Sequence, residues 1–368
     1  ILRRKSGSPQ KERGGIDVVK HVFITKPGDR VRMEPKDEYP HAPEAVSNFN
    51  ESAYFNIYDG AQKVGGWFRI GNRVNEGHAE VTICLYFPDG TAGFMFQKAK
   101  IDSNTAFDAG GARFDIIEPY RKLRVTYQGE ILMLADPNAL LDPGKAFKEN
   151  PKQPCAVDLH YTGISPIYGG EHLNPDGSPI DLDLNHALAR AHFEQHVKAQ
   201  GTIRVGDQTW TVSGYGLRDH SWGPRYWQNI HWYRWLPISF DESFGAMLMT
   251  TGTREGELDC GGMILNNGEY ELITECTIES DWDENFHQTA LRAWAKTERG
   301  EYHITGKVIT LVPVRNRRQL DNGEWLHTRI TEAMTEYRYQ DKVGYGLSEY
   351  CDQIIDGVPV GRNIAAAR

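Results

Sequence analysis

The sequence of 368 residues lacks long apolar segments and nucleotide-binding signatures. No run approaches the roughly 20 consecutive apolar residues that a membrane-spanning helix requires. Neither G-x-G-x-x-G after a predicted strand nor G-x-x-x-x-G-K-[ST] occurs, so a dinucleotide site or a P-loop has no motif. These absences predict a protein without a membrane span and without a nucleotide cofactor.

Concentrated positive charge is also missing from the chain. Lys and Arg number 41 against 50 for Asp and Glu, which gives a formal net charge of -9 and a pI near 5.8. Proteins that bind nucleic acids usually present a strongly basic face. We therefore expect no nucleic-acid partner.

Cysteine pairs with the spacing of a metal or redox site are absent as well. The sequence predicts buried free thiols in the reducing cytoplasm, with no metal and no cofactor. It leaves the oligomeric state open, a homodimer included. The five cysteines are far apart and form no C-x-x-C motif: Cys84, Cys155, Cys260, Cys276 and Cys351.

The pattern that the chain does contain is that of an antiparallel, all-β protein. In residues 81–87 the odd positions are all apolar, and on a strand they share one face. Helical periodicity is limited to short stretches at Pro137–Glu149 and at the beginning of residues 184–196. Turn dipeptides between β-rich runs predict hairpins at Asp89-Gly90, Gln128-Gly129, Gly206-Asp207, Asn267-Gly268 and Asn322-Gly323.

A loop rich in glycine and proline, residues 165–179, divides the chain into two β-rich parts. We predict a flexible N-terminal segment (1–30), an N-terminal β domain (31–183) and a C-terminal β domain (184–368). Closing each sheet into a barrel removes its exposed edges and opens a ligand-sized interior. A pocket is therefore expected inside a barrel.

Aromatic side chains are concentrated in residues 214–235, which contain four of the nine tryptophans. Such side chains provide apolar wall area together with directed hydrogen bonds, as a site for an apolar or aromatic ligand requires. A plain barrel core would explain the same density. The aromatic residues of the segment are Tyr215, Trp222, Tyr226, Trp227, Trp232, Tyr233 and Trp235.

Ionisable side chains lie inside this aromatic segment, at Arg218-Asp219-His220 and at Arg225. Apolar surroundings raise the pKa of a carboxyl group, so Asp219 could act as a general acid with His220 as base or relay. Alternatively, Asp219 caps a turn and forms an ion pair with Arg218 or Arg225.

The pattern G-x-G-x-x-D-H-x-W-G in residues 214–223 resembles the signature of the double-lipocalin group. This group includes AttH-like proteins, carotenoid hydratases (hydroxyneurosporene synthase) and tocopherol-cyclase-like proteins. Weaker similarity extends to His192-Phe193-Glu194-Gln195 and to the strands predicted around residues 54–59 and 65–73. The resemblance implies two lipocalin-like barrels side by side and, in enzymatic members, cofactor-free acid chemistry on alkenes.

A cluster of histidine and glutamate residues is a further candidate for the site. On a strand, His192, Glu194 and His196 would share one face and could bind a metal, although the H-E-x-x-H pattern is absent. As polar residues of a pocket, Glu194 and His192 could instead complement Asp219 in acid–base chemistry.

Two arginines, Arg69 and Arg73, lie on one face of a predicted strand and are another candidate for the site. These arginines could bind a carboxylate, or they could form ordinary salt bridges with Glu76 or Glu80.

The sequence thus predicts a cofactor-independent hydratase or dehydratase, isomerase or cyclase acting on an apolar alkene, isoprenoid or aromatic compound. A non-catalytic carrier of a hydrophobic ligand and a zinc hydrolase are the alternatives. The predicted catalytic residues are Asp219, His220 and Glu194. The predicted substrate-binding residues are His192, Tyr215, Trp222, Arg225, Trp227, Trp232, Trp67 and Arg73.

Overall fold

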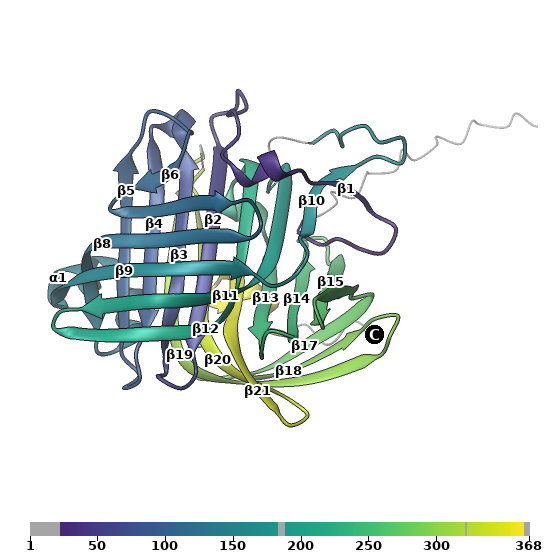
Figure 1. The fold of residues 1–368 in the computed structure, drawn as a ribbon. Helices are drawn as coiled ribbons and strands as arrows, with labels where there is room; N and C mark the ends of the chain where they lie inside the picture. Colours follow the sequence, from purple (N-terminus) through teal and green to yellow (C-terminus); the bar gives the residue numbers. More distant parts are fainter. Residues whose placement is uncertain (1–22, 183–187, 321, 364–368) are drawn as a thin grey trace, which may run out of the picture.

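The computed structural model describes residues 23–182, 188–320 and 322–363, and most of these residues form antiparallel strands in two sheets (Figure 1). The predicted all-β class is confirmed. No helix among the described residues is long and apolar enough to cross a membrane. The helical segments are α1 (Pro143–Glu149) and the 3-10 turns η1 (Pro35–Glu38), η2 (Val74–Glu76), η3 (Pro137–Leu141), η4 (Trp227–Asn229) and η5 (Val360–Asn363).

The first sheet closes on itself because β9 pairs with both β8 and β11. This double pairing links β11, β12, β2, β3, β4, β5, β8 and β9 into a ring, which we call the first barrel. The strands of the sheet are β1 (Arg30–Arg32), β2 (Phe49–Asp59), β3 (Val64–Arg73), β4 (His78–Tyr86), β5 (Ala92–Lys100), β6 (Phe107–Ala109), β7 (Ala112–Glu118), β8 (Lys122–Leu134), β9 (Lys152–Gly163), β10 (Tyr168–Leu173), β11 (Ala191–Val205) and β12 (Gln208–Pro224).

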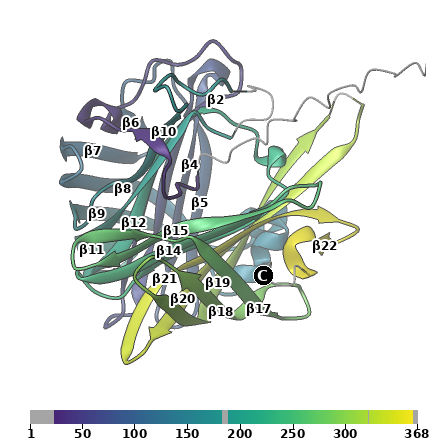
Figure 2. The ribbon, with the colours of Figure 1, turned by 90° about the vertical axis from the view of Figure 1, so that its right-hand side faces the viewer.

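The second sheet curls around a separate apolar core and lies beside the first barrel (Figure 2). Its two ends approach each other, since the Cys276 backbone N–H on the end strand β17 donates to the Cys260 sulfur on β15, the neighbour of the other end strand, at 3.3 Å. The strands are β13 (Trp232–Ser239), β14 (Phe244–Gly252), β15 (Leu258–Asn266), β16 (Glu269–Leu272), β17 (Glu275–Trp282), β18 (Gln288–Lys296), β19 (Glu301–Gln319), β20 (Trp325–Tyr339), β21 (Lys342–Ile355) and β22 (Val358–Pro359).

The change from one sheet to the other occurs between Pro224 and Trp232. The boundary predicted at residues 183/184 therefore falls within the first sheet. The physical reason is strand pairing: β11 and β12 form a hairpin whose second strand pairs with β2, far away in the sequence. Residues 1–22 of the predicted N-terminal segment lie outside the described residues.

Four of the five predicted hairpin turns are confirmed, and the one at Gln128-Gly129 is wrong. Gly129 lies within β8, which remains paired with β9 from Lys122 to Leu132. Gly129 has no positive φ, and a Cβ atom there would lie 2.5 Å from the Tyr127 hydroxyl, so a side chain at this position would require the Tyr127 ring to move. The helical stretch 137–149 is confirmed, whereas residues 184–187 lie outside the described residues.

The two faces of the first barrel have different surroundings. The odd residues of 81–87 are buried in the barrel interior, as predicted, together with apolar side chains from all around the ring. This packing fills the place where a pocket was expected. The even residues of β2 and β4, such as Tyr54 and Cys84, face outward and pack against the second sheet. A layer between the two sheets therefore contains the remaining space.

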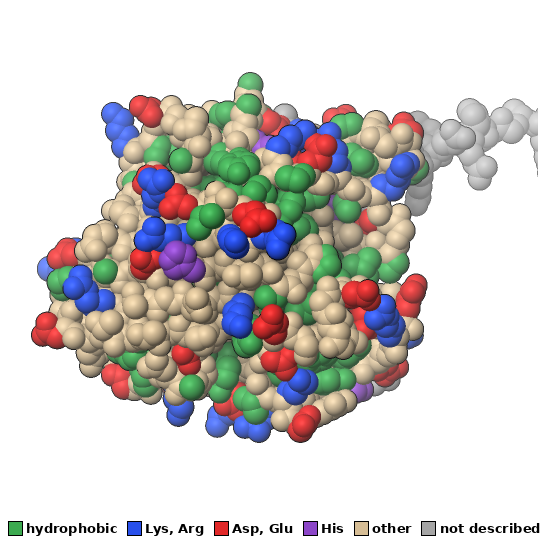
Figure 3. Space-filling model, in the orientation of Figure 1, with side chains coloured by type: hydrophobic (Ala, Val, Ile, Leu, Met, Phe, Trp, Pro, Cys, Tyr) green, Lys and Arg blue, Asp and Glu red, His purple; other side chains and the backbone are tan. Residues whose placement is uncertain are grey.

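The surface carries charges of both signs interspersed with neutral side chains on the face shown in Figure 3. This distribution agrees with the absence of basic clusters in the sequence. All five cysteines are free thiols, and four of them are buried. The cytoplasmic location and a homodimer stay predictions.

Candidate functional site

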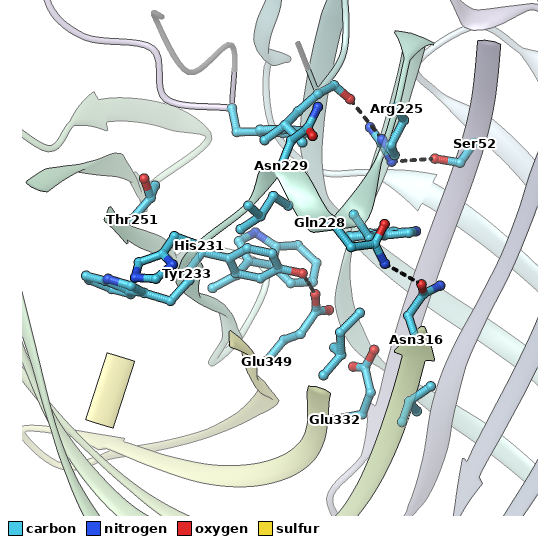
Figure 4. Close-up of a pocket in the computed structure, with 18 of the residues that line it drawn as sticks. Ser52, Arg225, Gln228, Asn229, His231, Tyr233, Thr251, Asn316, Glu332 and Glu349 are labelled. Carbon is cyan, nitrogen blue, oxygen red and sulfur yellow. Dashed lines mark hydrogen bonds between the residues drawn. The ribbon is translucent and has the colours of Figure 1, made fainter. Parts of the chain in front are cut away.

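A cavity of about 840 Å³ lies between the first barrel and the second sheet (Figure 4). Its volume falls in the range of small-molecule sites. One wall consists of the outward faces of β12, β2, β3 and β4, and the other of β13, β14, β20 and β21. Aromatic side chains and ionisable groups line it together, so it combines an apolar space with groups able to transfer protons.

Strand register builds the first wall from one row of polar side chains. Cross-strand pairing aligns residues on β11, β12, β2, β3 and β4, and members of a row on a pleated sheet point to the same side. All except the first member line the cavity. The row is Glu194, Asp219, Tyr54, Arg69 and Thr82.

The second wall presents a facing row. Trp235 pairs with Glu349, and Glu349 pairs with Glu332 across β13, β21 and β20. The Tyr233 hydroxyl donates a hydrogen bond to Glu349, which fixes this carboxylate toward the cavity (Figure 4). The two rows bring carboxyl groups from both sheets to one space.

Asp219 has no hydrogen bond or ion pair among the described residues, and its side chain is partly accessible from the cavity. Burial raises the pKa of its carboxyl group to about 6, while the positive charges of Arg225 and Arg69 oppose the shift. A carboxyl group with this pKa is populated in both protonation states near neutral pH. Its oxygens are also free to contact a ligand.

Glu332 and Glu349 form a coupled acidic pair. Burial raises the pKa of both groups, and their mutual repulsion raises that of Glu332 further, because two adjacent carboxylates cannot both ionise cheaply. One Glu332 oxygen is buried without a hydrogen-bond partner. Near neutral pH this pair holds a proton.

Tyr54 connects the two walls. Its ring packs edge-on against Trp235, with the centroids 5.5 Å apart. Burial raises the pKa of its hydroxyl, and the three lining carboxylates of Asp219, Glu332 and Glu349 raise it further. The hydroxyl therefore stays protonated among these carboxylates.

Glu194 and His192 are on the predicted face of β11, next to the Asp219 row. His192 lines the cavity, and burial lowers the pKa of its ring, so the imidazole is neutral. Glu194 lies behind the lining: Trp235 Nε1 donates to its Oε1 at 2.7 Å, and its other oxygen has no partner. Burial raises its pKa well above the ordinary value.

His220 points to the opposite face of β12, away from the cavity. Its Nε2 lies 2.9 Å from Glu51 Oε1, and the same oxygen lies 2.7 Å from His41 Nδ1. Trp222 faces this side too and stacks on His41 with the centroids 3.9 Å apart. The structure thus does not bring His220 or Trp222 together with Asp219, because neighbours on a strand alternate between faces.

Two His/Glu groups bear on metal binding. His192, Glu194 and His196 share one face of β11 as predicted, but the His196 ring nitrogens already contact the Tyr270 hydroxyl and the Ile238 carbonyl at 3.1 Å. A different group, His41, Glu51 and His220, has ligand-type atoms within 4.8 Å of one another among the described residues. In this group Glu51 is held by hydrogen bonds from both rings.

The remaining predicted residues divide between the cavity and other places. Trp67, Trp227, Trp232 and Arg225 line the cavity. Tyr215 and Arg73 are not among the lining residues, and Arg73 forms an ion pair with Glu76 at 2.7 Å.

Sequence reasoning missed Ser52, Glu332 and Glu349. Both glutamates belong to β strands in which the neighbouring residues are largely buried. An acidic residue inside such a strand was the available signal, since a buried carboxylate is rare unless it is paired or functional.

Solved structures with this architecture show that the fold is double-lipocalin-like. They include an AttH-like protein of Nitrosomonas europaea, 11% identical with a TM-score of 0.57, where the match covers 89% of this chain and 98% of that one. They also include kievitone hydratase from Nectria haematococca, 10% identical with a TM-score of 0.50, covering 86% and 92%. The predicted resemblance is confirmed for the fold. No curated protein matches the sequence. Residues 34–354 match the domain of unknown function DUF7064, and the chain belongs to that family.

Proposed function

We propose that the cavity is the active site of a cofactor-independent acid–base enzyme. The reaction is hydration or dehydration, isomerisation or cyclisation of an apolar alkene, isoprenoid or aromatic compound. The observation that carries the proposal is Asp219: a carboxyl group with a pKa of about 6, open to the cavity and without a hydrogen-bond or ion-pair partner among the residues that the structure describes. A purely structural carboxylate would be expected to have hydrogen-bond or ion-pair partners.

In the proposed mechanism, protonated Asp219 donates its proton to one carbon of the substrate double bond. The adjacent carbon becomes cationic, and the negative charge left on Asp219 and the aromatic lining of the cavity stabilise it. Water then adds and loses a proton, or the cation itself loses a proton from a neighbouring carbon. In either case the Glu349–Glu332 pair accepts the proton in its ionised form.

The Glu349–Glu332 pair takes the place of His220 and Glu194 as the partner of Asp219 in this mechanism. It faces Asp219 across the cavity, and the negative charge of Asp219 contributes to the raised pKa of Glu349. His220 is bonded to Glu51 on the other face of β12. Kievitone hydratase, a protein of the same fold, is by its name a hydratase, which supports this class of reaction.

The test is a turnover screen of the purified protein with isoprenoid and aromatic alcohols and alkenes, at pH 5 to 8. Asp219→Asn preserves the shape of the side chain and is expected to lower turnover by about 100-fold or more. For the unmodified protein, kcat/KM should be highest between about pH 6 and 7 and decline on both sides, because Asp219 must be protonated and Glu349 must be ionised.

Three variants identify the proton acceptor. Glu349→Gln should lower turnover strongly, whereas Glu194→Gln, one position along the Asp219 row, should lower it much less. A loss confined to Glu194→Gln would assign the base to Glu194 instead. His220→Gln serves as the control for the opposite face of β12. Full turnover by Asp219→Asn would exclude the proposed role.

The second candidate function is a non-catalytic carrier of a hydrophobic ligand, favoured by the size and aromatic lining of the cavity. A carrier would bind apolar ligands and leave every one of them unchanged. Asp219→Asn would then bind as well as the unmodified protein, and no product would form with either.

A further inference from the structure

Arg225 is a buried cation in the cavity wall and has no acidic partner in the part of the chain that the structure describes. Its side chain lines the cavity at 5% exposure. Nε donates to the Leu188 carbonyl at 2.9 Å, Nη2 to the Ser221 hydroxyl at 2.8 Å and Nη1 to the Ser52 hydroxyl at 3.4 Å. A guanidinium has five N–H groups, so two remain without an acceptor within residues 23–182, 188–320 and 322–363. All three acceptors are neutral.

Other buried arginines of the protein are neutralised. Arg218 donates to both oxygens of Glu38, at 2.5 and 2.8 Å, and Arg234 donates to both oxygens of Asp352 at 3.0 Å. Arg225 has no carboxylate oxygen within 4.0 Å among the described residues, although Asp219 lines the same cavity. A buried charge without a counter-ion is costly, and functional sites are where such a cost is retained.

A second arginine, Arg69, lies nearby; it forms an ion pair with Glu80 at 3.7 Å, as predicted, and its charge still acts on Arg225. The guanidinium groups of Arg225 and Arg69 lie 5.4 and 5.8 Å from the ring centroid of the same residue, Trp227. Burial and the charge of Arg69 lower the pKa of Arg225 to about 10, which means that both destabilise the positive charge of the guanidinium. An anion beside these groups would relieve both effects.

We propose that Arg225, held by Ser52 and Ser221, binds a carboxylate group of the substrate, which makes the substrate an apolar monocarboxylic acid. This inference rests on the proposed function and names its substrate class. The acidic side chains of the same cavity would repel a dianion such as a phosphate monoester. A single negative charge on an apolar skeleton matches the aromatic lining.

The geometry also limits where the reaction occurs. Ser221 and Asp219 are two residues apart on one face of β12, which is roughly 6.6 Å along a strand. A carboxylate on Arg225 would therefore place a carbon only a few bonds away beside the Asp219 carboxyl group. The reacting double bond is expected close to the carboxylate.

The test compares geranic acid with geraniol, which have the same carbon skeleton, and with geranyl phosphate as the dianion. Calorimetric titration at pH 8 measures each affinity, and tryptophan fluorescence reports binding in the cavity. The intact protein should bind the acid about tenfold more tightly than the alcohol or the phosphate. Equal affinity for acid and alcohol, or preference for the phosphate, would overturn the assignment of a carboxylate.

Variants assign the preference to Arg225. Arg225→Met should lose the preference for the acid and keep the affinity for geraniol, which shows that the cavity is intact. Arg225→Lys should keep part of the preference. Arg254→Met, at another lining arginine that is bonded to Gln353, is the matched control and should leave it unchanged. If Arg225→Met does not fold, a reduced preference in Arg225→Lys and in the double variant Ser52→Ala/Ser221→Ala supports the assignment, and an unreduced preference in both contradicts it.

Asp219→Asn separates this inference from the proposed function. Removing a negative charge from the cavity should preserve or increase the preference for geranic acid while turnover is lost. Preference without any dependence of turnover on Asp219 would contradict the enzyme mechanism and leave the carboxylate site standing. Turnover that depends on Asp219, without a preference for geranic acid, would support the enzyme mechanism and contradict the carboxylate site.

Discussion

The two faces of β12 differ in whether their ionisable side chains have partners. On the face toward the barrel interior, Arg218 is bonded to Glu38 and His220 to Glu51, so each charged group has a partner. On the face toward the cavity, Asp219 has no such partner within the described part of the chain. Adjacent residues of one strand thus serve two purposes. Paired groups hold the chain together, and the unpaired carboxyl group is available to a ligand.

This difference has an energetic consequence. A buried ion pair stabilises only as long as both members are present, so removing one member is expensive. An unpaired buried carboxyl group does the opposite, because ionising it opposes folding. Substitutions on the two faces of β12 should therefore change stability with opposite signs.

The largest effect is expected from Glu38→Gln, which removes the η1 partner of Arg218 on the barrel-interior face of β12. Arg218 is 1% exposed, and the variant leaves its guanidinium without a charged partner. The free energy of unfolding in urea should fall by about 3 to 5 kcal/mol. A loss below about 1 kcal/mol would mean that the pair does not hold the segment before β2 onto the barrel.

Glu51→Gln tests the second pair through its pH dependence. Burial alone would raise the pKa of Glu51, but hydrogen bonds from His220 and His41 lower it to about 2. A lowered pKa contributes stability above the ordinary value of 4.5, and this contribution is lost as the pH falls toward 2. The variant should be about 3 kcal/mol less stable at pH 6, and the difference should vanish near pH 2. A difference independent of pH would contradict the pairing.

Asp219→Asn should have the opposite sign. The folded protein holds the Asp219 proton more tightly than the unfolded chain does, so its contribution to stability is complete below about pH 4 and is lost as the pH rises through 6. At pH 8 the variant should be about 1 to 2 kcal/mol more stable in urea unfolding. Below pH 4 the two proteins should agree. A variant that is less stable at pH 8 would indicate a structural carboxylate.

The smallest effect is expected at the surface. Lys296 Nζ lies 2.7 Å from Glu275 Oε1, and both side chains are exposed. Lys296→Gln should change the free energy of unfolding by less than about 0.5 kcal/mol, because water screens exposed pairs. A change as large as that of Glu38→Gln would show that the loss of stability at β12 comes from breaking an ion pair and not from the burial of that pair.

Much of the fold could be predicted from local patterns. Alternation in residues 81–87 identified a strand and its buried face, and dipeptides such as Asn267-Gly268 marked true hairpins, where both residues have positive φ. Gln128-Gly129 has the same composition but lies inside β8, because pairing with β9 continues across it. The sheet boundary was missed for a similar reason, since β12 joins β2 only through a long-range contact.

For the site, the sequence by itself determined the candidate acid. Asp219 lies among aromatic residues, and burial raises its pKa for the physical reason that its surroundings suggested. The predicted pairing of Asp219 with His220 overlooked the alternation of strand faces, by which adjacent residues of β12 point to opposite sides.

Only the tertiary structure decided where the cavity lies and which groups share it. The barrel interior is filled, so the space is left where two sheets meet, and Glu332 and Glu349 reach Asp219 from strands late in the chain. The tertiary structure also decided which arginine has a counter-ion. Arg218 and Arg225 lie in the same aromatic segment of the sequence, but among the described residues only Arg218 forms an ion pair with a carboxylate. Packing of distant segments sets both outcomes, and no local pattern in the sequence records it.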